Sequence, residues 1–292
     1  MAPASRGAST IEIAANGFRF RADVAGEAGA PLVLLLHGFP QTKYTWRHQL
    51  PALAAAGFRA LAPDQRGYSP AARPQGAAHY GVDALLADAL ALATEHGAER
   101  FHLVGHDWGG QLAWLLAARH PERVHTLSVL SRPHPAAFAR ALASDPQQSE
   151  RSKHHRAFQD PNTATLLIED GARRLRGMLL VHGVPERDAE AYIAALSTHA
   201  AMDAALNWYR AAFQGASALA TSDTPPVRVP TLFVWGDADR TVGRAAAEAT
   251  RDFVVARYRF VELPGVGHFL TDQAAERVTQ ELLAHLAAHA SD

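Results

Sequence analysis

The sequence predicts an α/β fold with a mostly parallel, doubly wound sheet, and three observations support this prediction. Short apolar runs recur along the chain, each ends in turn residues, and several are followed by a helical pattern. The first run, at 31–36, is continuously apolar, which is typical of a strand buried on both faces of a parallel sheet. The chain has 292 residues and no cysteine, so one large domain forms without disulfides or thiolate metal sites.

The expected strands and helices alternate along the chain. After the first run, the expected strands cover residues 58–62, 101–104, 124–130, 231–235 and 258–261. Apolar residues at spacings of three and four predict a helix over 82–93, and a second helix continues from 111 to 119.

Between residues 132 and 223 the pattern changes. This stretch is rich in alanine, has few β-branched runs and shows helical spacing at 189–196 and 206–213. We therefore expect an α/β core formed by residues 1–131 and 224–292, with a helical lid, or cap, at 132–223 inserted before the late strands.

The charge balance excludes several classes of partner. Lys plus Arg number 28 and Asp plus Glu number 29, which leaves no excess of basic residues for nucleic acid or an anionic membrane. The N-terminal residues lack the apolar core of a signal peptide, and no run of about 18 apolar residues occurs. We expect a soluble, cytoplasmic protein without nucleic-acid or membrane partners, metal or cofactor; whether it forms a homodimer is left open.

Residues 105–109 have the spacing of a nucleophile elbow, the tight strand-to-helix turn G-x-S-x-G, but Asp107 stands where serine would attack. The motif follows an expected strand and opens an expected helix, whose first N–H groups point at the site. A carboxylate is already ionised at neutral pH, so it can attack an sp³ carbon and form an alkyl ester without a base. We expect Asp107 to be a nucleophile.

An acid and a histidine follow the elbow in the chain order that this chemistry needs. Asp237 and Asp239 come directly after the expected strand at 231–235, and His268 lies in a glycine-flanked loop after the last strand. We expect Asp239 to orient His268, which would activate water to hydrolyse the ester, and Asp237 to be a turn residue. His106 is expected to pack inside, beside the elbow.

The segment at 36–40 ends the strand expected next to the elbow. The backbone N–H groups of Phe39 and Trp108 are the natural donors of an oxyanion hole. We expect Pro40 to fix the turn of this loop, with a cis peptide bond as one way to do so, and His37 and Pro40 to contact the substrate.

The motifs at 37–40, 64–69 and 105–110 resemble those of the soluble epoxide hydrolases of the α/β-hydrolase superfamily. The resemblance runs through nearly the whole chain and includes Asn207-Trp208-Tyr209-Arg210. It implies an α/β-hydrolase fold and an epoxide hydrolase that uses no cofactor. Such an enzyme opens a small hydrophobic epoxide to a vicinal diol through an Asp107 ester.

In that family, two lid tyrosines hold the epoxide oxygen and donate a proton as the ring opens. Tyr209 matches the second tyrosine, whereas the place of the first, before the segment at 158–161, is taken by His154. A subset of bacterial relatives resembles this chain in pairing a histidine with a tyrosine. His155 and Trp208 are then expected near the substrate. The alternative is that His154 and His155 are exposed residues of a charged helix. Three lid leucines, Leu166, Leu167 and Leu179, suggest either a hydrophobic pocket or packing within the lid.

The main alternative function is a haloalkane or haloacid dehalogenase that uses the same ester. The indole of Trp108 is suited to bind a halide, but the second halide donor of haloalkane dehalogenases falls at Phe39. Fluoroacetate-type enzymes carry arginines at the positions of Trp108 and Gln111. These differences favour an epoxide.

Two further alternatives belong to other classes. A non-catalytic binding protein on a hydrolase scaffold would need neither Asp239 nor His268 in the correct order. An ordinary esterase would need a serine at position 107.

Overall fold

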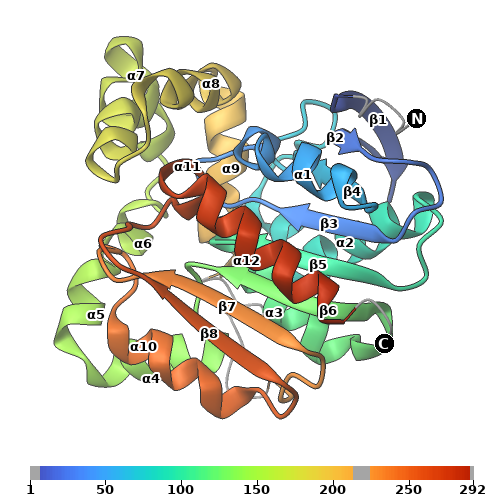
Figure 1. Cartoon of the computed structure of the whole chain (residues 1–292). Helices are drawn as coiled ribbons and strands as arrows, with labels where there is room; N and C mark the ends of the chain where they lie inside the picture. Colours follow the sequence, from blue (N-terminus) through green and yellow to red (C-terminus); the bar gives the residue numbers. More distant parts are fainter. Residues whose placement is uncertain (1–6, 213–223, 290–292) are drawn as a thin grey trace.

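The computed structural model describes residues 7–212 and 224–289, and a central sheet organises this part of the chain (Figure 1). Its strands are β1 (Ser9–Ala15), β2 (Phe18–Ala25), β3 (Leu32–Leu36), β4 (Arg59–Pro63), β5 (Phe101–His106), β6 (Val124–Leu130), β7 (Thr231–Gly236) and β8 (Tyr258–Leu263). In the described residues their order is β1-β2-β4-β3-β5-β6-β7-β8. All pairs from β4 onward are parallel, and the two pairs made by β2 are antiparallel. The prediction of a mostly parallel sheet is confirmed.

Each strand expected from the sequence is present within two residues at either end, but the β1–β2 hairpin was not predicted. These two strands meet at Asn16 and Gly17, which have φ angles of 47° and 78°. An Asn-Gly pair with two positive φ angles is the preferred two-residue turn between antiparallel strands. That dipeptide, between two segments of alternating polarity, was the sequence signal for the hairpin.

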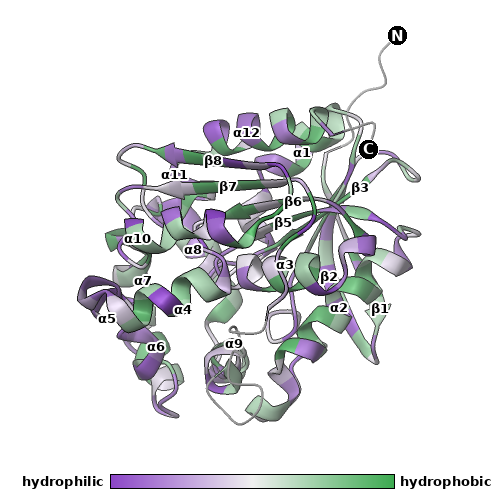
Figure 2. Cartoon of the chain, turned by 90° about the horizontal axis from the view of Figure 1, so that it is seen from below, coloured by the Kyte–Doolittle hydropathy of each residue, from purple (hydrophilic) through white to green (hydrophobic). Residues whose placement is uncertain are grey.

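Both faces of the sheet are covered by helices, which explains the continuous apolar run of β3. Leu32, Leu34 and Leu36 pack into one buried cluster with α2 (Val82–Glu95) and α3 (Trp108–Arg119). Val33 and Leu35 pack into a second cluster with α1 (Gln49–Ala55) and α12 (Ala275–Ala287). Figure 2 shows α1 and α12 on one side of the strands and α2 and α3 on the other.

Between β6 and β7 the described chain is helical. These helices are α4 (Pro135–Ser144), α5 (Pro146–Arg151), α6 (His154–Ala157), α7 (Thr163–Val181), α8 (Glu186–Leu196) and α9 (His199–Ala212). They lie within the range expected for the lid, of which residues 213–223, including Phe213, lie outside the described residues. The first of them, α4, packs against α10 (Arg244–Ala249), a helix that follows β7.

The remaining helical segments are short. They are η1 (Lys43–Trp46), η2 (Ala77–Tyr80), η3 (Pro121–Arg123), η5 (Thr250–Phe253) and α11 (Leu270–Gln273). Within the two described ranges, no helix combines the length and apolar character needed to cross a bilayer.

Candidate active site

Asp107 occupies the sharp turn between β5 and α3. Its φ of 51° and ψ of −118° lie in a region that residues with a side chain rarely adopt. The turn depends on two glycines, because a Cβ at Gly105 would lie 2.3 Å from the carbonyl oxygen of Gly109. A Cβ at Gly109 would lie 2.1 Å from the carbonyl oxygen of Leu36. The expected nucleophile elbow is therefore present, with a carboxylate at its tip.

Two groups hold the Asp107 carboxylate. The backbone N–H of Phe39 donates to Oδ1 over 2.9 Å, and Nε2 of His268 lies 3.4 Å from Oδ2. Trp108 is the first residue of α3, so its N–H is one of those that the helix itself leaves without a partner. The peptide bond between Phe39 and Pro40 is cis. Of the two expected oxyanion donors, the Phe39 N–H contacts the carboxylate, and the Trp108 N–H directly follows Asp107 in the chain.

His268 is buried between two carboxylates. Its Nδ1 lies 2.8 Å from Oδ2 of Asp239, and Nε2 faces Asp107. The Thr241 hydroxyl lies 2.8 Å from Oδ1 of Asp239 and 2.7 Å from Nδ1 of His268. Because Asp239 can only accept, Thr241 donates to Asp239 and accepts from the imidazole. The structure thus brings Asp107, His268 and Asp239 into one line of contacts.

Asp239 is fixed by its own loop, whereas Asp237 is not part of this line. Oδ1 of Asp239 also accepts the backbone N–H groups of Thr241, over 2.7 Å, and Val242, over 3.0 Å. Asp237 is exposed and accepts the backbone N–H of Gly265 over 2.6 Å. Of the two acids, the one expected to contact His268 does so.

The charges around the site keep Asp107 and His268 ionised. Burial alone would lower the pKa of His268, but the Asp239 and Asp107 carboxylates raise it to about 10. Burial alone would raise the pKa of Asp107, but the hydrogen bond and charge of His268 bring it well below its ordinary value. At neutral pH the site therefore holds an imidazolium between two carboxylates.

A cavity of about 230 Å³ opens beside Asp107 and His268. Its apolar lining consists of Phe39, Pro40, Phe138, Phe158, Met178, Val242 and Phe269. The three lid leucines are not among the lining residues: Leu167 and Leu179 are buried in the core, and Leu166 is exposed. Of the two interpretations of these leucines, packing holds for Leu167 and Leu179, and other residues supply the apolar part of the cavity wall.

Tyr209, His154 and His155, from the helices between β6 and β7, also line this cavity. Tyr209, on α9, is 3% exposed, and burial raises the pKa of its hydroxyl well above the ordinary value, so the hydroxyl keeps its proton. Its ring meets that of Trp108 edge-on, with the two centroids 5.1 Å apart.

The two histidines stand on α6, close to each other and to Tyr209. Their ring centroids are 4.4 Å apart, and those of His154 and Tyr209 are 6.5 Å apart. Burial lowers the pKa of His154 and lowers that of His155 to about 3. Both are partly buried in the cavity wall, so the interpretation that they are exposed residues of a charged helix is wrong.

Two residues expected to contact the substrate do not line the cavity. His37 is fully buried, and both its ring nitrogens face backbone groups, of Gly38 and Gln65. The indole N–H of Trp208 donates to the carbonyl of Arg66 over 2.8 Å, and the Trp208 side chain is absent from the cavity wall. The structure thus places neither His37 nor Trp208 at the cavity wall, where a substrate contact was expected.

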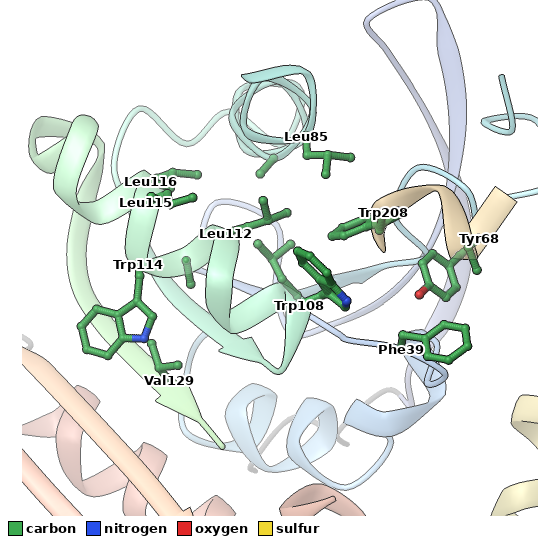
Figure 3. Close-up of a cluster of buried hydrophobic side chains, with 14 of the residues drawn as sticks. Phe39, Tyr68, Leu85, Trp108, Leu112, Trp114, Leu115, Leu116, Val129 and Trp208 are labelled. Atoms are coloured by element: carbon green, nitrogen blue, oxygen red, sulfur yellow. The ribbon is translucent and has the colours of Figure 1, made fainter. Parts of the chain in front are cut away.

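Trp208 packs among aromatic side chains next to the elbow. Figure 3 shows Trp208 beside Trp108, with Tyr68 and Phe39 at the same end of the cluster. The centroid of Trp208 lies 6.0 Å from that of Trp108 and 6.1 Å from that of Tyr68. On the other side of the elbow, His106 is buried and its Nε2 lies 2.8 Å from the carbonyl oxygen of His268, as expected for an internal residue.

Arg132 also lines the cavity and was not among the expected site residues. It is 7% exposed, and its Nε donates to Oε1 of Gln111 over 3.0 Å. The sequence signal was a charged residue two positions after the apolar strand that ends at Leu130, at the carboxyl edge of the sheet where ligands bind in such folds. In the described parts of the chain, no group of three or more His, Asp or Glu side chains is arranged to hold a metal ion.

The family model described as the alpha/beta hydrolase fold matches residues 31–275. The chain belongs to the α/β-hydrolase family. It is 34% identical to epoxide hydrolase A of Mycobacterium tuberculosis, an alignment that covers 93% of this chain and 95% of that protein. It is 32% identical to epoxide hydrolase 4 of Mus musculus, over 94% of this chain and 78% of that protein.

Solved structures agree with these relatives. The crystal structure of epoxide hydrolase A from Mycobacterium thermoresistibile superposes with a TM-score of 0.82 at 32% identity, covering 96% of this chain and 98% of that one. A metagenomic epoxide hydrolase from hot environments superposes with a TM-score of 0.84 at 31% identity, covering 96% and 99%. The resemblance to soluble epoxide hydrolases read from the three motifs is confirmed.

Proposed function

We propose that this protein is an epoxide hydrolase that opens a small epoxide to a vicinal diol through a covalent ester of Asp107. One observation carries the proposal: the carboxylate at the elbow lies between the Phe39 N–H and His268, in a cavity that is also lined by Tyr209. Relatives named epoxide hydrolases, at 34% and 32% identity over nearly the whole chain, support it.

In the first step, Oδ2 of Asp107 attacks a ring carbon and forms a C–O bond. The bond between that carbon and the ring oxygen breaks, and the oxygen leaves with the electron pair. Tyr209 donates its proton to this oxygen, which becomes the first hydroxyl of the diol. His154 is the second candidate for this oxygen, but its Nδ1 lies 3.0 Å from the carbonyl oxygen of Arg151 and therefore carries the proton of the neutral ring. Its Nε2 can donate to the epoxide oxygen only when the imidazole is protonated, and burial lowers the pKa of His154.

When Asp107 becomes a neutral ester, His268 releases its extra proton to solvent, and it takes one up again when the carboxylate is regenerated. In the second step, the neutral His268 takes a proton from water, and the hydroxide attacks the carbonyl carbon of the Asp107 ester. The N–H groups of Phe39 and Trp108 stabilise the oxyanion that forms. When this intermediate collapses, the diol oxygen leaves and takes the proton from His268. The acid formed at Asp107 ionises, and its proton balances the one that Tyr209 gave up.

We propose that residues 132–223 act as the lid in this reaction. The described helices of this segment supply Tyr209, His154 and His155 to the cavity, whereas the core supplies Asp107, His268 and Asp239. In this arrangement the lid provides the acid for ring opening, and the core provides the nucleophile and the base.

A dehalogenase is the second candidate, since the same ester forms when a halide leaves. Two observations favour the epoxide. The side chain of Phe39 offers no hydrogen-bond donor to a halide, and the Tyr209 hydroxyl, which keeps its proton, is suited to the oxygen of an opening epoxide. A non-catalytic binding protein is disfavoured because it needs no contact between Asp239 and His268.

A side-by-side assay of styrene-type epoxides and haloalkanes tests the proposal, with diol and free halide as the two readouts. We expect diol from the wild-type protein and none from the Asp107→Ala variant. In His268→Gln the ester should accumulate, and intact mass should increase by the mass of the epoxide. Halide release without diol would favour the dehalogenase, and the absence of an adduct in His268→Gln would argue against the ester mechanism.

A single turnover in ¹⁸O water tests which atom the water attacks. Because hydroxide attacks the ester carbonyl, label is expected in the Asp107 carboxylate. Label found only in the diol would mean that water attacks the epoxide directly.

A further inference from the structure

Arg132 is a buried cation without a carboxylate partner among the described residues. It is 7% exposed. Within the described residues its guanidinium makes one hydrogen bond, which runs from Nε to the side chain of Gln111. Nη1 and Nη2, which carry four N–H donors, make no ion pair within 4.0 Å in the described part of the chain. A buried charge is stable only when it is paired, so this guanidinium is suited to a partner that the chain itself does not supply.

The position of Arg132 is fixed by its surroundings. Its carbonyl oxygen accepts the indole N–H of Trp114 over 2.8 Å, and its guanidinium lies 4.2 Å from the ring centroid of Phe138. A Cβ at Gly110 of the elbow helix would lie 2.9 Å from Cβ of Arg132, so this glycine leaves room for the side chain. The guanidinium is therefore held in place in the cavity wall before any ligand arrives.

The charge of the cavity lining is strongly positive. Three arginines, Arg132, Arg151 and Arg240, line it, whereas Asp107 is its one carboxylate among the described residues. Arg151 donates to the carbonyl oxygen of Asp239, and Arg240 is exposed at the solvent side. Of the three, Arg132 alone combines deep burial with free donors in the described chain.

Asp107 does not serve as the partner of Arg132. The Asp107 carboxylate is held by Phe39 and His268, and no atom pair between it and Arg132 lies within 4.0 Å. The guanidinium charge nevertheless contributes to the low pKa of Asp107, so Arg132 lies close enough to act on a group bound against the nucleophile.

We propose that the substrate is an epoxide that carries a carboxylate, and that Arg132 binds this carboxylate while Asp107 attacks the ring. This inference rests on the proposed function and names its substrate class. A planar guanidinium binds a carboxylate through two parallel hydrogen bonds, and Arg132 also offsets the repulsion between this carboxylate and Asp107. The phenylalanines and Met178 of the lining fit an apolar body on the same molecule.

Two epoxides of the same shape test the inference: 3-phenylglycidate, which carries a carboxylate, and 3-phenylglycidamide, in which a neutral amide replaces it. We expect the wild-type protein to prefer the carboxylate by at least about tenfold in kcat/KM. In Arg132→Met this preference should disappear, with KM for the carboxylate rising about 10- to 100-fold and the amide changing less than about threefold. Arg156→Met is the matched control, because Arg156 is exposed on α6 and does not line the cavity.

The possible outcomes separate this inference from the proposed function. If the wild-type protein hydrolyses the amide but does not prefer the carboxylate, the inference is overturned and the proposed function stands. Equal losses for both epoxides in Arg132→Met also overturn it, since Arg132 would then only support Asp107. If the wild-type protein converts styrene-type epoxides to diols but hydrolyses neither of these two, the inference alone is overturned. If it hydrolyses none of these epoxides, the proposed function is overturned as well. Hydrolysis of the amide by folded Arg132→Met ensures that a loss with the carboxylate is a loss of binding.

Discussion

Nε2 of His268 lies 3.4 Å from Oδ2 of Asp107, so the proposed base and the proposed nucleophile are in direct contact. In the free protein this contact helps to raise the pKa of His268 to about 10. The imidazole is therefore protonated at neutral pH and cannot accept a proton as a base. The proposed ester resolves this conflict. Once Asp107 is alkylated it carries no charge, and one of the two carboxylates that raise the pKa of His268 is gone.

The first prediction is that a neutral residue at position 107 lowers the pKa of His268. Asp107→Asn has the shape of the carboxylate but, like the ester, no charge. The charged form of His268 then loses the attraction of Asp107, and its pKa should fall by at least about one unit from the value near 10. An NMR titration of ¹⁵N-labelled histidine measures this, with His268→Gln to assign the signal. An unchanged pKa would mean that Asp239 alone sets it.

The second prediction concerns Thr241, whose hydroxyl lies between Asp239 and His268. Thr241→Val keeps the size of the side chain and the backbone N–H to Asp239 but removes the hydroxyl. His268 should be less well oriented, so kcat should fall about tenfold with little change in KM, and more of the ester should accumulate. Thr241→Ser restores a hydroxyl and should recover most of the activity. Equal kcat for the Val and Ser variants would exclude a positioning role.

The line of Asp107, His268 and Asp239 was predictable because each residue follows a recognisable strand. In a parallel sheet the carboxyl ends of the strands meet at one edge, so residues far apart in sequence come together there. Short glycine-containing turns then fix which side chain points at the site. The pattern of strand, turn and helix carries all of this information.

Arg132, His37 and Trp208 could not be assigned in the same way. Trp208 and Tyr209 are neighbours on α9, and which of them faces the cavity is decided by the bond from the Trp208 indole to Arg66. His37 lies in a matching motif but is taken up by backbone contacts. The side chain of Arg132 is placed by contacts with Gln111 and Phe138, which lie in other elements. Side-chain directions set by such tertiary contacts leave no local sequence pattern.

The third prediction is that Gly38 cannot carry a side chain. A Cβ at this position would lie 2.3 Å from Oδ1 of Asp107, so either the carboxylate or the loop must move. A displacement of about 1 Å at a reacting group reduces the rate about 100-fold, and this is the loss that we expect in kcat for Gly38→Ala. Gly177→Ala is the control, since Gly177 is exposed on α7 with nothing within 4 Å of its Cβ position. Full activity of Gly38→Ala would contradict the close approach of this loop to Asp107.

The last prediction is a loss of stability in mild acid, caused by histidines that are buried without charge. His102 and His285 form, with His125 and His289, a group of four neighbouring histidines away from the catalytic line. Burial lowers the pKa of both His102 and His285 from 6.5 to about 4. Below pH 6.5 the unfolded chain takes up protons that these folded residues refuse, so the free energy of unfolding falls as the pH drops from 6.5 to 4.

At pH 5 the loss from His102 alone is about 2 kcal/mol relative to pH 8. His102→Asn can keep a hydrogen bond to Thr126, which His102 contacts over 2.9 Å, and it removes the titrating group. Denaturant unfolding at pH 8 and pH 5 should therefore show a smaller difference between the two pH values for His102→Asn than for the wild-type protein. His79→Asn, at an exposed position, should match the wild type. If His102→Asn also matches the wild type, the His102 imidazole must accept a proton in the folded protein as easily as in the unfolded chain, and its burial among the other histidines would then carry no electrostatic penalty.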